Sequence, residues 1–231
     1  MTEVPKVQVT VAAPPSAVWH ALRDRDRIRQ WHGWEFEGGA DGGLDQEIEL
    51  IYFTDVETDE HGILLNGGDR IDLEPVEGGT RVTLTRAAPA DDPDWDNYYD
   101  DITEGWITFI EQLRFAVEVH PDDARRTILL RGPVGISPLA ALSAEDLQPD
   151  DEFELQLPGE KATGRVRFRS EHQLGLAVDG WNHGLLVLTH EPEAGLGMAL
   201  LSLYDVDEEL RSALSARWHE WWRGTIQQAT S

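Results

Sequence analysis

The chain has 231 residues, no cysteine, and 44 acidic against 19 basic side chains, which gives a formal net charge of −25 at pH 7. A surface this acidic repels phosphate backbones and anionic lipid headgroups, so we expect neither nucleic acid nor a membrane as a partner. The lack of cysteine excludes disulfides and thiolate chemistry, and without a long apolar run or a signal-like start the chain is expected in the cytoplasm.

The first half opens with alternating apolar residues and then changes period. KVQVTV from Lys6 places its valines on one face, which predicts a half-buried strand. Pro14 and Pro15 end that strand and open a helix with Val18, Trp19 and Leu22 facing inward. From about Trp34 to Arg86, short apolar alternations are broken by glycine pairs, and we interpret them all as antiparallel strands joined by tight turns, QEIELIYF included.

A long amphipathic helix is predicted at the end of the first half. Its apolar stripe has helical spacing and consists of Ile102, Trp106, Phe109, Leu113 and Val117, widened by Ile110. The acidic segment Asp91–Asp101 before it lacks the ligand ladder of an EF-hand, so we interpret it as a solvated lid.

The second half repeats the same order of elements. RTILLRG predicts a strand, SPLAALSAEDL a short helix behind a proline, and five further alternating segments predict strands. The closing helix carries a stripe of Leu210, Leu214, Trp218, Trp221 and Thr225, flanked by Trp222 and Ile226. The repeat predicts two domains, 1–120 and 121–231.

This order of elements predicts an α+β fold in each domain. A curved antiparallel sheet with one apolar face needs a cover, which one long amphipathic helix provides. The gap between helix and sheet is where an apolar ligand would lie.

Several apolar positions of the opening segment form a pattern of their own. The pattern is a strand, a proline break, Val-Trp, a leucine and a closing tryptophan: Val9, Val11, Pro14, Val18, Trp19, Leu22 and Trp31. It resembles the start of SRPBCC proteins, also called START-like or helix-grip proteins, and is most similar to the branch named for the activator of the ninety-kilodalton heat-shock protein's ATPase. GGTRVTLT from Gly78 and GWITFIEQL from Gly105 resemble the family's last strand and helix start, whereas the second half matches only in layout and in its last strand and tryptophan-bearing helix.

The resemblance implies a helix-grip fold, present in two tandem copies of which the second is divergent. It also implies a hydrophobic cavity between the sheet and the C-terminal helix. Trp31 and Trp34 would then lie near the cavity mouth. The full set of expected lining residues is Trp31, Trp34, Phe53, Tyr98, Trp106 and Ile110. For Trp106, as for Trp19 and Trp218, core packing is the favoured role and ligand contact the alternative.

Catalytic and metal sites find little support in the sequence. No histidine pair has the i, i+4 spacing of a helical metal site, His20 points away from the apolar face of its helix, and no serine lies in a nucleophile elbow. We assign no catalytic residue, metal or cofactor, with Tyr98 or Tyr99 as a candidate only for a cyclase-like role.

The favoured function is therefore the binding of an apolar small molecule without catalysis. A polyketide cyclase- or dehydratase-like enzyme is the alternative, and an enzyme would need at least two titratable side chains converging in the cavity. A co-chaperone-like module with a protein partner is a further alternative, by analogy with the branch name.

Overall fold

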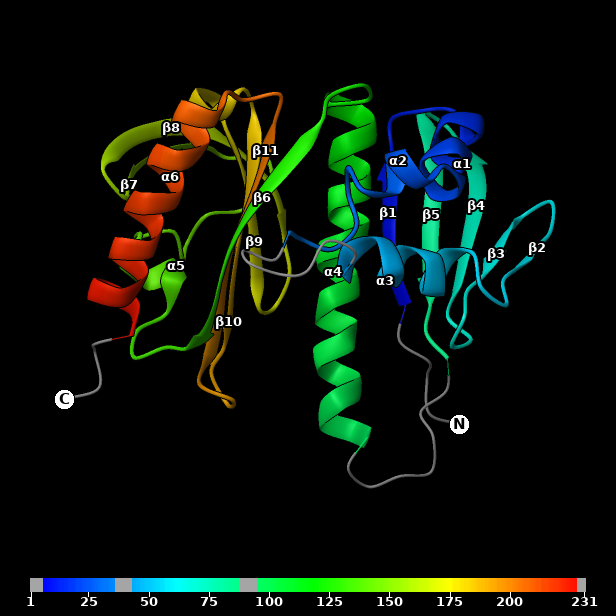
Figure 1. Cartoon of the computed structure of the whole chain (residues 1–231), viewed down its shortest axis with the longest axis horizontal. Helices are drawn as coiled ribbons and strands as arrows, with labels where there is room; N and C mark the ends of the chain where they lie inside the picture. Colours follow the sequence, from blue (N-terminus) through cyan, green and yellow to red (C-terminus); the bar gives the residue numbers. More distant parts are fainter. Residues whose placement is uncertain (1–5, 36–42, 88–94, 228–231) are drawn as a thin grey trace. The chain divides into compact units, whose positions relative to one another are not determined.

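The computed structural model describes residues 6–35, 43–87 and 95–227, and of residues 95–102 it describes the backbone alone. The chain forms two compact units, unit 1 (Met1–Asp122) and unit 2 (Asp123–Ser231), drawn in Figure 1. Each unit is an antiparallel sheet with a long helix at its C-terminal end. The fold class is therefore α+β, with a helix-grip arrangement that occurs twice.

Unit 1 has a five-stranded sheet with the order β1-β5-β4-β3-β2. Its strands are β1 (Lys6–Val11), β2 (Glu57–Thr58), β3 (Gly62–Leu64), β4 (Arg70–Val76) and β5 (Gly79–Thr85). Its helices are α1 (Pro15–Arg23), α2 (Arg25–Ile28), α3 (Gly43–Tyr52) and α4 (Trp95–Val119). α4 packs against β1 and α1, and its buried residues Trp106, Ile110 and Leu113 recur at helical spacing.

Unit 2 has a six-stranded sheet with the order β6-β11-β10-β9-β8-β7. Its strands are β6 (Arg125–Pro133), β7 (Glu152–Leu157), β8 (Glu160–Arg169), β9 (Gln173–Val178), β10 (Gly184–Glu191) and β11 (Leu196–Tyr204). Its helical elements are α5 (Pro138–Ala141), η1 (Asp179–Trp181), α6 (Glu208–Trp221) and η2 (Trp222–Ile226), of which η2 is a π-helical turn.

The two units share one topology. In each, the first strand pairs with the last strand, and the remaining strands follow in reverse chain order: β1 with β5, and β6 with β11. A short helix with proline in its first turn follows the first strand in both units. The strand order therefore shows the repeat that residue identities show only weakly.

α3 corrects the interpretation of residues 46–53 as a strand. A strand would place Ile48, Leu50 and Tyr52 on one face, but Leu50 is 56% exposed while Ile48 and Tyr52 are buried. The buried pair has the i, i+4 spacing of a helix, and glutamate, glutamine and leucine favour that state. The expected lid at residues 91–101 is also corrected in part. Its residues 95–101 belong to α4, and its residues 91–94 lie outside the described residues.

After Trp218, the buried face of the last helix lies one residue further along the chain than expected. Leu214, Trp218, Trp222 and Ile226 all belong to the hydrophobic core of unit 2, and Trp221 packs against that core only partly buried. Four-residue steps continue through η2, so Trp222 and Ile226 belong to the core stripe and Trp221 flanks it.

Candidate functional site

Six ring-bearing residues of unit 1 gather where α4 meets the chain between α2 and α3, and we call them the aromatic cluster. They are Trp31, His32, Trp34, Tyr52, Trp106 and Phe109, with neighbouring ring centroids 4.5 to 6.3 Å apart. Most of these contacts are edge-to-face or tilted, as the quadrupoles of the rings favour. The six rings therefore pack against one another as one aromatic cluster.

A hydrogen-bonded polar chain runs through this cluster. Tyr52 Oη lies 2.9 Å from His32 Nδ1, and Glu47 Oε1 lies 3.2 Å from His32 Nε2. His32 and Tyr52 are fully buried, whereas the Glu47 side chain is 40% exposed. The chain thus connects a buried phenol through an imidazole to a carboxylate at the surface.

The position of the protons follows from the surroundings of Tyr52. Burial, with added repulsion from the carboxylates of Glu47 and Asp69, raises the pKa of the Tyr52 phenol well above its usual value of 10. The phenol therefore keeps its proton and donates a hydrogen bond to His32 Nδ1. In that tautomer Nε2 carries the histidine proton and donates to Glu47.

A second polar group beside the cluster involves Trp106. The Arg86 guanidinium lies 3.1 Å from Asp69, and both side chains are largely buried. Trp106 Nε1 donates to Asp69 Oδ2 at 2.8 Å, and Arg86 Nη1 donates to Thr103 Oγ1 at 2.8 Å. These bonds fix α4 to the sheet and determine the orientation of the Trp106 ring.

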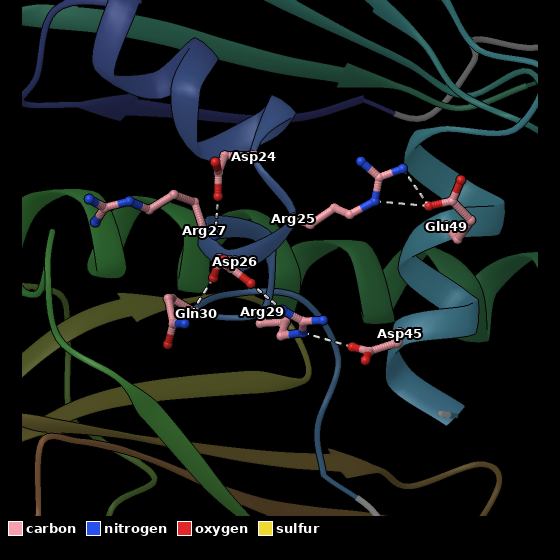
Figure 2. Close-up of polar contacts among 8 residues, drawn as sticks. All are labelled: Asp24, Arg25, Asp26, Arg27, Arg29, Gln30, Asp45 and Glu49. Atoms are coloured by element: carbon pink, nitrogen blue, oxygen red, sulfur yellow. Dashed lines mark hydrogen bonds and ion pairs between the residues drawn. The ribbon is translucent and has the colours of Figure 1, made fainter. Parts of the chain in front are cut away.

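Ion pairs connect α2 to α3, as Figure 2 shows. Arg25 donates to Glu49 Oε2 from Nε at 3.0 Å and from Nη2 at 2.7 Å, and Arg29 Nε donates to Asp45 at 2.7 Å. Asp24 caps α2 by accepting the Arg27 amide. These contacts hold α3, which carries Glu47 and Tyr52, against the segment that carries His32.

A groove lies on unit 1 between α1 and the C-terminal end of α4, with a volume of about 220 Å³. Its apolar lining consists of Ala13, Ala17, Ala21, Trp31, Ala116, Val117 and Pro121. Its polar lining consists of His20, Arg27, Gln30, His120 and Asp122. Trp31 thus belongs both to the groove and to the aromatic cluster, and it separates the groove from the polar chain.

The six residues expected to line one cavity do not all lie together. Trp31, Trp34 and Trp106 belong to the aromatic cluster, and Ile110 is fully buried one helical turn after Trp106. Phe53 lies outside the cluster, with the guanidinium carbon of Arg25 3.8 Å from its ring centre. Tyr98 belongs to α4, but its side chain and that of Tyr99 lie outside the described residues.

Sequence reasoning missed His32, Tyr52 and Glu47 as a group. The sequence indicates no role for His32 and predicts a strand for the segment with Tyr52, so no pattern connected them. The helical spacing from Ile48 to Tyr52 was the available signal, because it places Glu47 and Tyr52 on one helix. His20 is exposed, as expected, yet it lines the groove.

Two general features can be stated for the part of the chain that the structure describes. No three histidine, aspartate or glutamate side chains there are grouped as metal ligands would be. No helix among those residues has the length and apolar character needed to cross a membrane.

No protein-family model matches the chain, and no curated protein matches it. Among solved structures it is similar to DynU16, a protein of the dynemicin biosynthetic locus, at 20% identity and a TM-score of 0.36, with 94% of each chain covered. It is also similar to the di-domain ARO/CYC StfQ of the steffimycin biosynthetic pathway, at 11% identity and a TM-score of 0.34, over 94% of this chain and 91% of that one. Likenesses at these TM-scores assign no ligand or reaction, and the branch named from the opening segment stays a prediction.

Proposed function

We propose that unit 1 is a binding module for a small, apolar, ring-shaped molecule that occupies the groove between α1 and α4. The observation that carries this proposal is the groove itself, which alanines on two helices line above the fully buried Trp31. Binding sites for small molecules are concave and mostly apolar, with a few polar groups that orient the ligand. The groove has this composition.

The volume of the groove limits the size of the ligand. A dry cavity of about 150 Å³ holds a benzene molecule, so the 220 Å³ of this groove suit one substituted ring or two fused rings. Trp31 forms the buried floor of the groove: its Nε1 donates to the Ala21 carbonyl at 2.9 Å, and its own carbonyl accepts from Gln112.

Unit 2 offers a larger but less suitable recess. It has a volume of about 430 Å³ and lies between the end of α5, strand β7 and Trp221. Polar atoms make up a larger share of its lining surface than in the groove of unit 1, so an apolar ligand would cover more polar surface there. For this reason the proposal assigns the ligand to unit 1.

A cyclase- or dehydratase-like enzyme is the second candidate, and the polar chain of Glu47, His32 and Tyr52 favours it. Two titratable groups, a phenol and an imidazole, converge inside an aromatic wall, which is what an enzyme of this kind needs. However, both groups are fully buried and satisfy each other's hydrogen bonds. A substrate would have to separate them, so binding at the groove is the first choice.

The test is to fill the groove. Ala17 is half-buried on α1 and lines the groove, and leucine in its place would occupy the ligand's space. With indole as the probe, calorimetric titration is expected to show one site per chain, weakened at least about tenfold by Ala17→Leu because of the steric overlap.

Ala213→Leu is the matched control, because Ala213 is an exposed alanine on α6 in unit 2. It should leave indole binding unchanged. Equal binding by the two variants would show that the groove is not the site. No binding to the wild-type chain would contradict the proposed function and would favour a protein partner instead.

The enzyme candidate has a separate test. Liquid chromatography with mass spectrometry of a bound polyketide-like compound, before and after incubation, should show no change in its mass or its retention time, since ring closure without loss of water alters only the second. A change in either that His32→Asn abolishes while binding persists would replace the binding proposal with the enzymatic one.

A further inference from the structure

We infer that the groove is built for a ligand with a carboxylate, and that Arg27 is the cation that recognises it, in competition with Asp122. This inference rests on the proposed function, since it names the chemical class of the ligand at the same groove. The ligand is a monocarboxylate whose apolar ring lies against the apolar lining of the groove and whose carboxylate lies at Arg27.

The arginines of the α2 segment have different directions. Figure 2 shows Arg25 and Arg29 extending toward Glu49 and Asp45 on α3, while the Arg27 side chain leaves α2 on the other side. Of these three arginines, Arg27 is the one that lines the groove. The Arg27 guanidinium therefore lies at the groove and does not help to attach α3.

A carboxylate already lies at Arg27. Arg27 Nη2 is 2.8 Å from Asp122 Oδ1, and their side chains are 34% and 82% exposed. An exposed pair of this kind is weak, because water and salt screen it. Asp122 therefore occupies the position that a ligand's carboxylate would take, and it can be displaced.

Arg27 is the arginine among the described residues that line the groove, and Asp122 is the acidic one. Arg27 presents a planar set of N–H donors that matches both oxygens of a carboxylate. Once a ligand's carboxylate displaces Asp122, the guanidinium is the charged group that it meets there.

The net charge of −25 does not prevent an anion from binding there. At an ionic strength near 0.15 M the Debye length is about 8 Å, so distant carboxylates are screened. A guanidinium in direct contact with the ligand is screened much less and determines the local preference.

The test compares two probes that differ in charge but not in shape, indole-3-carboxylate and indole-3-carboxamide. Calorimetric titration of the wild-type chain should show the acid binding about fivefold more tightly than the amide, the ratio expected for one partly exposed ion pair. Arg27→Gln should reduce this ratio to about one by weakening the acid alone. Asp122→Asn should strengthen the acid about two- to fivefold and leave the amide unchanged, because it removes the competitor.

Arg81 and Glu74 supply matched controls on β5 and β4. They form an ion pair of similar length and exposure, with Nη1 and Oε2 2.7 Å apart and side chains 39% and 64% exposed, but they do not line the groove. Arg81→Gln and Glu74→Gln should therefore change neither affinity. The gain expected for Asp122→Asn also separates the inference from simple loss of folding.

The outcomes separate the two proposals. If acid and amide bind equally, or if Arg27→Gln weakens both alike, the carboxylate inference is overturned while the groove remains a binding site. If neither probe binds and indole does not bind either, the proposed function itself has failed.

Discussion

Tyr52 and Tyr204 are buried phenols, one in each unit, and both resist ionisation. Burial raises the pKa of Tyr204 to about 12, partly opposed by the nearby Arg125 guanidinium. Burial also raises the pKa of Tyr52 well above 10. An unfolded chain has no such burial, so its tyrosines ionise near pH 10.

This difference predicts how stability changes at alkaline pH. Below pH 10 both states hold the phenol protons, so the contribution to stability is fully present. Above pH 10 the unfolded state loses them first, and each buried tyrosine should then lower the free energy of unfolding by about 1.4 kcal/mol per pH unit. For Tyr204 the decrease continues up to its folded pKa of about 12.

Urea unfolding at pH 9, 10 and 11 would measure this slope. Interference from lysine is small, because the chain holds only Lys6 and Lys161. Because the unfolded tyrosine titrates near pH 10, Tyr204→Phe is expected to remove about 1.4 kcal/mol from the total decrease between pH 9 and pH 11, whatever it does to stability at pH 7. An unchanged slope in that variant would contradict the burial argument.

At the scale of elements, α3 and the turn after α2 fit together at Gly33. Gly33 has a φ of +60°, and a Cβ there would lie 2.6 Å from Leu44 Cδ1 at the start of α3. The glycine therefore serves two purposes: it permits a left-handed backbone, and it leaves space for α3. Ion pairs from Arg25 and Arg29 complete the contact between the two segments.

Gly33→Ala should therefore destabilise the chain more than a left-handed conformation alone explains. The conformational part costs about 1–2 kcal/mol, and displacement of Leu44 should add to it. Gly67→Ala is the control, because Gly67 has a φ of +98° with no atom within 4 Å of its Cβ position.

Leu44→Ala in the Gly33→Ala background should recover the added part of the cost. Thermal or urea unfolding of these variants would measure it. Equal losses for Gly33→Ala and Gly67→Ala would mean that α3 does not depend on this contact.

The elements also show what sequence periodicity can and cannot predict. Strands such as β1 alternate strictly between exposed and buried residues, and α4 carries a four-turn stripe, so period alone identified them. α3 has only ten residues, and in its Ile48–Tyr52 stretch alternation and helical spacing overlap. The polar chain was not predictable, because His32 meets Tyr52 across 20 residues that fold back on themselves.

At the scale of the whole molecule, the two units share a strand order but differ in what lies beneath the last helix. In unit 2, Leu214 and Trp218 of α6 pack into a hydrophobic cluster with the strands, and Arg217 of the same helix donates to Glu160. In unit 1, the corresponding helix meets His32 and Tyr52 as well as the aromatic rings. The repeat therefore accounts for the strand order of both units. The polar chain and the groove, by contrast, are features of unit 1.

The most direct test of the account is to follow the tryptophan side-chain signals in a ¹H–¹⁵N correlation spectrum while indole is added. Assignment by single Trp→Phe variants identifies the Nε1–H signal of Trp31, a fully buried residue at the groove, and that of Trp218, which is equally buried but lies in unit 2 away from the groove. We expect the Trp31 signal to shift until it saturates and the Trp218 signal to stay in place. A Trp31 signal that does not move, or equal shifts of both signals, would contradict binding at the groove.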